Sequence, residues 1–300
     1  MRALAARAVS GPAGLLAASA VGAAVFLWPF FGGTPGVTST TAVGLGTAAA
    51  LFALELGARR LDTRGLALLA ALAALDAGAR AVVVTGIGGF SPIFLLVLCG
   101  GYVFGASYGF LLGAASLLVS ALVTGGLGPW LPYQMFAAAW VGAAAGLVGR
   151  RRTGRPTWVD VAILAVTGVV TGYGFGAVMD IWNWTFYQPS PGLGFHPGMP
   201  AGVTLAHFAR FYLATSAVYD SFRAGGNAVM VVALGSPVLV ALARLRARLQ
   251  VEVVAEDAWA EDAWAEPAGR PAPAGHDSTR RRKLRSPSAR KAAAKPISTG

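Results

Sequence analysis

Charged residues are scarce in this chain. Of its 300 residues only 12% are Asp, Glu, Lys or Arg, whereas 55% are hydrophobic, and the mean hydropathy is +0.60. In soluble domains charged residues make up about a quarter of the sequence. The composition therefore excludes an ordinary soluble domain and predicts an integral membrane protein.

Cysteine is almost absent, and recognisable ligand motifs are missing. The single cysteine, Cys99, lies inside an apolar segment, which excludes a disulfide framework and is typical of a small buried side chain. The sequence has neither a glycine-rich phosphate loop with a lysine nor a zinc-ligand spacing. We therefore expect no ATP hydrolysis by this chain, no metal and no other cofactor.

Basic residues outnumber acidic ones, but they are unevenly placed. The formal net charge of +11 and the pI near 10.6 would suit nucleic acid. Most arginines, however, flank apolar segments, and every lysine lies in the C-terminal tail, at Lys283, Lys291 and Lys295. Basic residues beside membrane helices mark the cytoplasmic side, so topology explains this charge better than nucleic-acid binding does.

The longest apolar region runs from residue 64 to residue 151 and is apolar all round rather than on one face. A helix needs about 20 apolar residues to cross a membrane, and glycine and proline clusters divide this region into four such pieces. The predicted crossings are 65–85, 92–104, 106–124 and 131–149.

The remaining apolar runs complete an all-α integral membrane protein of about eight transmembrane helices. Two precede the long region, at 13–31 and 40–58, and two follow it, at 158–180 and 226–247. The run 204–222 is predicted to be an outer-leaflet or re-entrant helix, because another full crossing would carry the RLRAR cluster outside. Both termini are then cytoplasmic, in the plasma membrane of a bacterial cell.

Three regions follow from this organisation. Residues 1–64 form two additional N-terminal transmembrane helices, and residues 65–249 form a six-helix core. Residues 250–300 contain a doubled AEDAW and a basic block, a composition that predicts a disordered, charged cytoplasmic tail.

Ser107 lies in GASYG, which matches the GxSxG pattern of a serine nucleophile. The segment begins a predicted membrane helix, and Gly105, Gly109 and Gly113 recur at every fourth position. Such a ridge of small residues allows helix backbones to approach closely. The only nearby candidate bases, His196 and His207, are expected on the outer side. The pattern therefore favours helix packing over a protease.

Asp76 and Arg80 lie one helical turn apart and are able to pair. Ionisable residues within a membrane mark functional sites, but a structural ion pair near the outer end explains the two equally well. Both interpretations stay open.

Polar and aromatic residues gather at the predicted outer face. Several belong to the stretch after residue 180, which is expected to be a loop, and others begin or end helices. Such a convergence describes a small-molecule pocket, although an aromatic belt also explains Trp130. The candidate substrate-binding residues are Arg80, Trp130, Tyr133, Gln134, Asp180, Trp182, Asn183, Trp184, Asp220 and Asn227.

Two stretches resemble a known family. LCGGYVFGASYGFLLGAASLLVSALVTGGLGPWLPYQMFAAAW and YDSFRAGGNAVMVVALGSPVLVALAR are similar to the substrate-binding S component of energy-coupling factor (ECF) vitamin transporters. The resemblance covers about residues 65–248, and GPWLPYQM is its most specific part. It departs from the family in the two N-terminal helices and the charged tail.

The resemblance implies a six-helix core and a vitamin-sized ligand at the outer face, with cobalamin-type members the most similar. It also implies a transmembrane T subunit and two ATPase subunits as partners. Family members contact the T subunit through an AxxxA ridge on the first core helix. The matching residues here are Ala67, Ala70, Ala71 and Ala74.

Two other classes of function remain. An intramembrane enzyme would use Asp76, Asp180 or Asp220 with a metal or lipid substrate, but these acids lie singly on three predicted helices. A scaffold or lipid-binding protein would leave Gln134, Asn183 and Asn227 without a role.

Overall fold

The computed structural model describes residues 12–31, 44, 46–51, 53, 57, 61–82, 93–149, 155–186 and 191–264, with side chains except at 12–13, 28–29, 31, 185–186 and 249–264. Contacts divide the chain into Met1–Glu252 and Val253–Gly300. The description below concerns the first unit. The predicted helix 40–58 lies largely outside the described residues. The predicted disordered tail 250–300 is helical as far as Trp264, where α10 ends, and lies outside the described residues beyond it.

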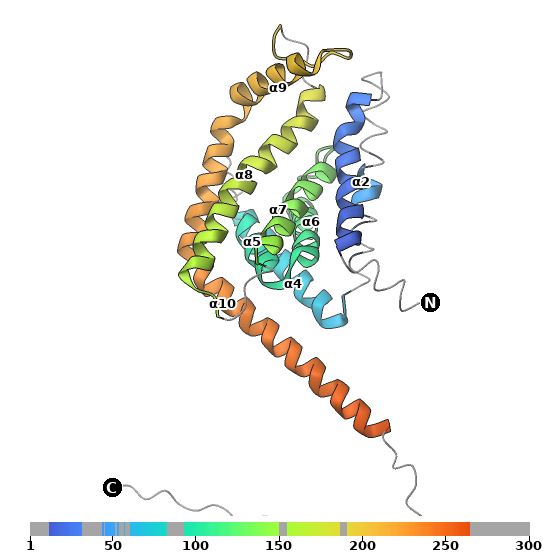
Figure 1. Cartoon of the computed structure of the whole chain (residues 1–300), viewed down its shortest axis with the longest axis vertical. Coiled ribbons are helices and arrows are strands. Elements are labelled where there is room, and N and C mark those ends of the chain that lie inside the picture. The colour runs from blue at the N-terminus through green and yellow to red at the C-terminus, as the bar shows by residue number, and fades with distance from the viewer. Residues whose placement is uncertain are drawn as a thin grey trace, which may run out of the picture. The chain divides into compact units, whose positions relative to one another are not determined.

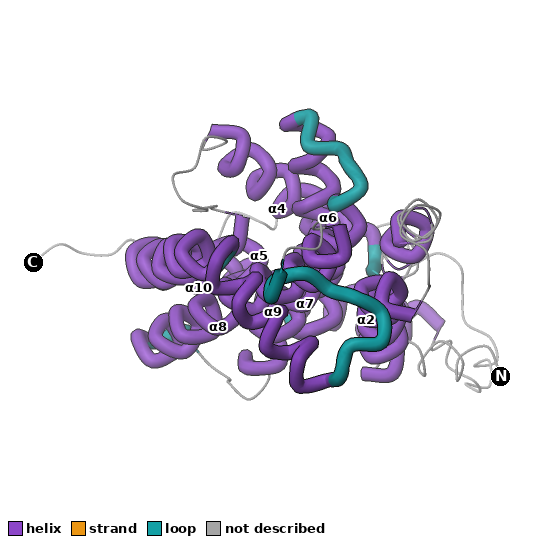
Figure 2. Tube along the Cα trace, turned by 90° about the horizontal axis from the view of Figure 1, so that it is seen from above, coloured by secondary structure: helices purple, strands orange, loops and turns teal. Residues whose placement is uncertain are grey.

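The described part of the chain is helical throughout (Figure 1). Four helices form its centre: α4 (Thr63–Val82), α5 (Ile93–Phe104), α6 (Ala106–Thr124) and α7 (Leu131–Gly149). Viewed from above, α2 (Pro12–Phe31) lies on one side of α6 and α7, and α8 (Trp158–Phe186) and α10 (Ala217–Trp264) lie on the other (Figure 2). The short α9 (Ala201–Thr215) precedes α10. The all-α prediction is confirmed.

Four of the described helices are long and apolar enough to cross a membrane: Ala106–Thr124, Leu131–Gly149, Trp158–Trp184 and Ala217–Arg248. They indicate a multi-pass membrane protein. Two further predicted crossings, Gly14–Leu27 and Phe94–Phe104, are shorter apolar helices. The 12 residues of α5 rise only about 18 Å, short of a hydrocarbon layer of about 30 Å. The total of eight crossings stays a prediction.

The helices α6 and α7 share the most extensive contact of the bundle because glycines face each other across it. A Cβ atom at Gly142 would overlap the carbonyl oxygen of Gly109, and one at Gly109 would overlap that of Gly142. One at Gly113 would overlap the Ala138 carbonyl oxygen. The predicted role in packing is thus confirmed for Gly109 and Gly113.

Gly105 differs from the other two: a Cβ at Gly146 of α7 would overlap its carbonyl carbon, but its own missing Cβ faces open space. It separates α5 from α6 with a φ of 99°, a conformation that favours glycine, and nothing lies within 4 Å of the position of its missing Cβ. Gly125 ends α6 in the left-handed region with a φ of 69°. Ser107, in the GxSxG pattern, is exposed on the first turn of α6.

The C-terminal half corrects two predicted boundaries. Helix α8 continues to Phe186, so the predicted loop after residue 180 begins as helix, and Trp182, Asn183 and Trp184 are helical. The predicted helix 204–222 is divided at Ser216: α9 ends at Thr215 and α10 begins at Ala217. The last predicted crossing therefore starts nine residues earlier than 226, because residues 217–225 pack as helix against α8. With 15 residues, α9 is too short to cross a membrane.

Polar contacts tie three helices together at the end where α5 finishes and α8 begins. Asp160 accepts hydrogen bonds from the Thr157 backbone N–H and hydroxyl, both at 2.6 Å, and from the Tyr102 hydroxyl at 2.6 Å. Arg246 of α10 donates to the Val103 carbonyl oxygen at 2.6 Å.

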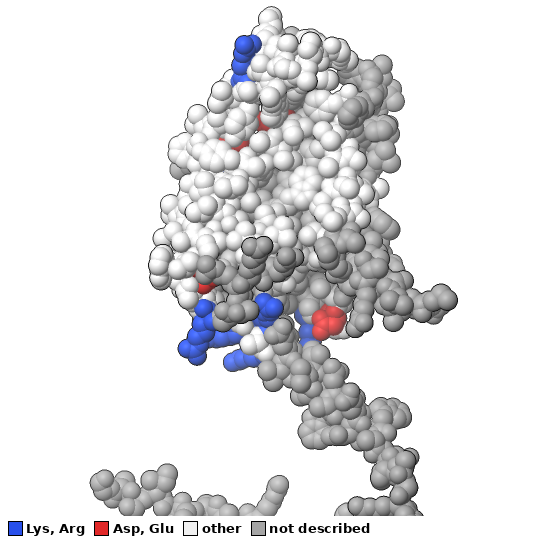
Figure 3. Space-filling model, viewed as in Figure 1, with Lys and Arg blue, Asp and Glu red and all other residues white. Residues whose placement is uncertain are grey.

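Figure 3 shows Lys and Arg gathered at the lower end of the face drawn, one more such group near the top, and a broad, nearly uncharged belt between them. This distribution is typical of a membrane protein whose basic end is cytoplasmic.

Candidate functional site

Glycines on α8 allow α10 to lie close against it. Gly168, Gly172 and Gly176 are spaced four apart, so they share one face of the helix. A Cβ at Gly172 would meet Ala224, and one at Gly176 would overlap the Asp220 carboxylate. The stretch GVVTGYGFG carries this signal in the sequence. The glycines position the polar side chains of α10 directly on the α8 backbone.

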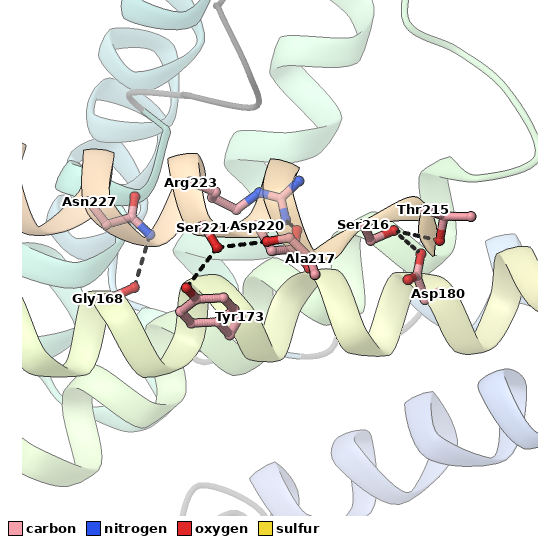
Figure 4. A network of polar contacts seen from close by, with 10 residues as sticks. All are labelled: Gly168, Tyr173, Asp180, Thr215, Ser216, Ala217, Asp220, Ser221, Arg223 and Asn227. Atoms are coloured by element: carbon pink, nitrogen blue, oxygen red, sulfur yellow. Dashed lines mark hydrogen bonds and ion pairs between the residues drawn. The ribbon is translucent and has the colours of Figure 1, made fainter. Parts of the chain in front are cut away.

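Polar side chains follow this contact along α8 and α10 (Figure 4). The Asn227 side-chain amide donates to the Gly168 carbonyl oxygen at 3.0 Å. The Tyr173 and Ser221 hydroxyls are 2.9 Å apart. Farther toward the α9 end, the Ser216 hydroxyl donates to Asp180 Oδ1 at 2.8 Å. The break between α9 and α10 thereby supplies a donor to the buried carboxylate of α8.

Asp220 and Arg223 form a buried ion pair in the middle of this network. Only 1% of the Asp220 side chain and 11% of the Arg223 side chain are exposed. The guanidinium also lies over the rings of Phe175 and Tyr219, with its central carbon 5.1 and 5.0 Å from the ring centroids. Such contacts with aromatic faces further stabilise the guanidinium cation of Arg223.

Asp180 and Asp220 are brought near each other, although they are far apart in the sequence. Asp220 lies close enough to Asp180 to act on it electrostatically, and Arg223 acts on both carboxylates. Among the described residues, Asp180 Oδ2 and Asp220 Oδ2 are buried without a hydrogen-bond partner. Burial and the adjacent Asp220 raise the pKa of Tyr212, on α9, to about 12, so its hydroxyl remains a neutral donor. The region retains acceptor capacity that a ligand could use.

Two groups of aromatic rings include tryptophans of the last turns of α8, which also carry Asp180. Trp184 donates from its indole to the Leu193 carbonyl oxygen at 2.6 Å, and its ring lies 5.2 Å from Phe208 and 5.5 Å from Phe195. Tyr133 of α7 lies 5.3 Å from Trp182 and 5.0 Å from Phe26 of α2. Helices α2, α7, α8 and α9 therefore all contribute rings at the end of the bundle opposite the basic cluster.

The ten predicted substrate-binding residues divide between this region and other places. Tyr133, Trp182, Trp184, Asp180 and Asp220 lie in it and are buried. The Asn227 amide is occupied by the α8 backbone, which explains it as a packing residue. Ser216 and Tyr212 complete the region, and sequence reasoning missed both because only the fold brings them to these carboxylates.

The other four predicted residues lie apart from the carboxylates or face outward. Arg80 donates to the Ser120 hydroxyl of α6 at 3.1 Å. Trp130 is 40% exposed and donates to the Gly126 carbonyl oxygen one turn earlier, as expected of a residue in an aromatic belt. Asn183 is exposed, and Gln134 is half-buried.

Comparison with known protein families, with curated proteins and with solved structures finds no match to this chain.

Proposed function

We propose that the chain is the membrane-embedded, substrate-binding S subunit of an ECF-type importer, with no enzymatic activity of its own. It captures a vitamin or a similar small molecule at the outer face, cobalamin being the best candidate. A T transmembrane subunit and two ATPase subunits then drive delivery. The observation that carries the proposal is the meeting of two buried carboxylates, each with an unpartnered oxygen, and aromatic rings at the non-basic end of the bundle. A few polar groups within an apolar, aromatic surround are typical of small-molecule sites.

The exposed face of α4 supports the partner assignment. Ala67, Ala70, Ala71 and Ala74 are all exposed, whereas Leu69, Leu72 and Ala73 on the other side of the helix are buried. A face of small residues permits close contact with another membrane helix. Because these four alanines are exposed in the described part of the chain, this face of α4 is open to contact by the T subunit at the cytoplasmic half of the helix.

An intramembrane enzyme is the second candidate, and one observation favours it. The expectation that the acids are scattered is wrong for Asp180 and Asp220, because α8 and α10 bring them together. Asp76 lies elsewhere, on α4. A paired acid site would turn over a substrate, whereas an S subunit releases its ligand unchanged.

The first experiment is to purify the full chain in detergent, denature it and examine the released small molecules by absorbance and mass spectrometry. A vitamin at a stoichiometric ratio supports the proposal, and a corrinoid spectrum identifies cobalamin. A protein that is empty and also fails to bind any added vitamin contradicts it.

Asp180→Asn is expected to lower ligand occupancy roughly tenfold or more, because a hydrogen bond to a charged group contributes about 1.5–3 kcal/mol. Occupancy is measured as the ratio of released ligand to protein. Tyr173→Phe, which removes only the contact with Ser221, serves as the matched control and should leave the ratio unchanged. Equal occupancy in wild type and Asp180→Asn would place the ligand elsewhere.

A further inference from the structure

One buried carboxylate lies outside the candidate site. Asp76, on the inner face of α4, is 0% exposed. Within the described part of the chain, neither of its oxygens has a hydrogen-bond partner. The Ser116 hydroxyl of α6 is equally buried, equally without a partner, and acts on the Asp76 carboxyl. Within the described residues, a single neutral hydroxyl is thus the donor that faces this buried carboxyl across the α4–α6 contact.

The predicted pairing of Asp76 with Arg80 is not formed. Among the described residues, the Arg80 side chain donates a hydrogen bond to the Ser120 hydroxyl at 3.1 Å. Arg80 acts on Asp76 only through its charge, without an ion-pair contact. The arginine therefore holds α4 to α6 and does not donate to the Asp76 carboxyl.

Asp160 shows how this chain accommodates an ionised, buried carboxylate. It is 5% exposed and receives three hydrogen bonds, from the Thr157 N–H, the Thr157 hydroxyl and the Tyr102 hydroxyl. Hydrogen bonds to the charged form stabilise it. Asp76 is more deeply buried and faces one hydroxyl in place of three donors, so the same charge there would be compensated much less.

We infer that Asp76 is a proton-binding site in the α4–α6 contact. The carboxylate takes one proton from water and becomes a neutral carboxylic acid, whose O–H donates to Ser116 Oγ. A single proton thus removes the buried charge, and the hydrogen bond between the two groups can still form, with the acid as its donor. A metal cation fits less well, since the two Asp76 oxygens and the Ser116 hydroxyl supply a single charged ligand and the Arg80 charge opposes a second cation.

The surroundings contain few other groups that could take this proton. On α4 the neighbouring charged group is Arg80, which also interacts electrostatically with Tyr219 of α10. Helix α6 presents Ser116 and Ser120, and its one titratable side chain, Tyr108, lies on the first turns at the other end. On α5, Cys99 is buried and the Tyr102 hydroxyl is bound to Asp160. Asp76 is the only carboxyl among them.

The proton also determines what Arg80 binds. With Asp76 neutral, Arg80 is free to donate to Ser120, as observed. When the proton leaves, the carboxylate one turn away attracts the guanidinium, and an Asp–Arg pair at this spacing is favourable. Arg80 must then release Ser120, which loosens α4 from α6. Proton binding is thereby coupled to the packing of α4.

Infrared spectroscopy of the purified full-length protein at neutral pH tests this inference. The carbonyl stretching band of a protonated carboxylic acid is expected in wild type, lost in Asp76→Asn and retained in Asp160→Asn. Thermal unfolding should show Asp76→Asn at or above the wild-type Tm, because the amide imitates the neutral acid, and Asp160→Asn well below it. An acid band unaffected by Asp76→Asn, or equal losses of Tm in both variants, would overturn the inference.

Ser116→Ala provides a second route that keeps the acid in place. Removal of the acceptor should move the same carbonyl band to higher frequency without abolishing it. If Asp76→Asn fails to fold, this variant still tests the inference. An unmoved band would show that the Asp76 acid does not donate a hydrogen bond to Ser116.

Discussion

Arg223→Ala is expected to destabilise the folded protein by roughly 3–5 kcal/mol, because it leaves a buried charge without its partner. Asp220 is 1% exposed, and its carboxylate packs against the α8 backbone at Gly176. The same substitution removes the contacts of the guanidinium with Phe175 and Tyr219. The loss is measured by thermal unfolding in detergent and by titration with a denaturing detergent.

Two further variants separate the ion pair from a general effect of losing an arginine. Asp220→Asn combined with Arg223→Ala should recover part of the loss, because no buried charge then lacks a partner. Arg210→Ala, at an exposed arginine of α9, should stay within about 0.5 kcal/mol of wild type. If Arg223→Ala is as stable as Arg210→Ala, the ion pair does not hold α10 in place.

Gly142→Ala is the second substitution with a large expected effect. The added methyl group would overlap the carbonyl oxygen of Gly109, which belongs to the backbone of α6 and cannot turn aside. The helices must separate, which costs about 1–3 kcal/mol of folding free energy. Thermal unfolding should show a fall in Tm despite the higher intrinsic helix propensity of alanine.

Gly78→Ala is the matched control, since it makes the same chemical change inside a helix. Gly78 is exposed on α4, and nothing lies within 4 Å of the position of its missing Cβ. Its replacement should gain up to about 1 kcal/mol from helix propensity alone. Opposite signs for the two substitutions support close α6–α7 packing, and a stabilising Gly142→Ala contradicts it.

The amino-acid sequence by itself determined the helical, membrane-embedded character of the chain and many of its boundaries. The predicted helices 106–124 and 131–149 agree with α6 and α7 to the residue. Their ends are local properties: glycines and prolines interrupt an otherwise apolar run, and Gly125 stops α6 through its own backbone conformation. Spacing also predicted the packing role of Gly109 and Gly113, because residues four apart share a helix face whatever lies opposite.

Only the tertiary structure decided which polar groups have partners. The spacing of Asp76 and Arg80 allowed the two side chains to pair, but in the structure Arg80 binds Ser120 on another helix. Asp180 and Asp220 lie on separate predicted helices, and the glycine face of α8 brings them together with Ser216. Periodicity shows which side of a helix a residue occupies, but the partner of a buried polar group depends on the neighbouring helix and its distance. That information arises only when the helices pack.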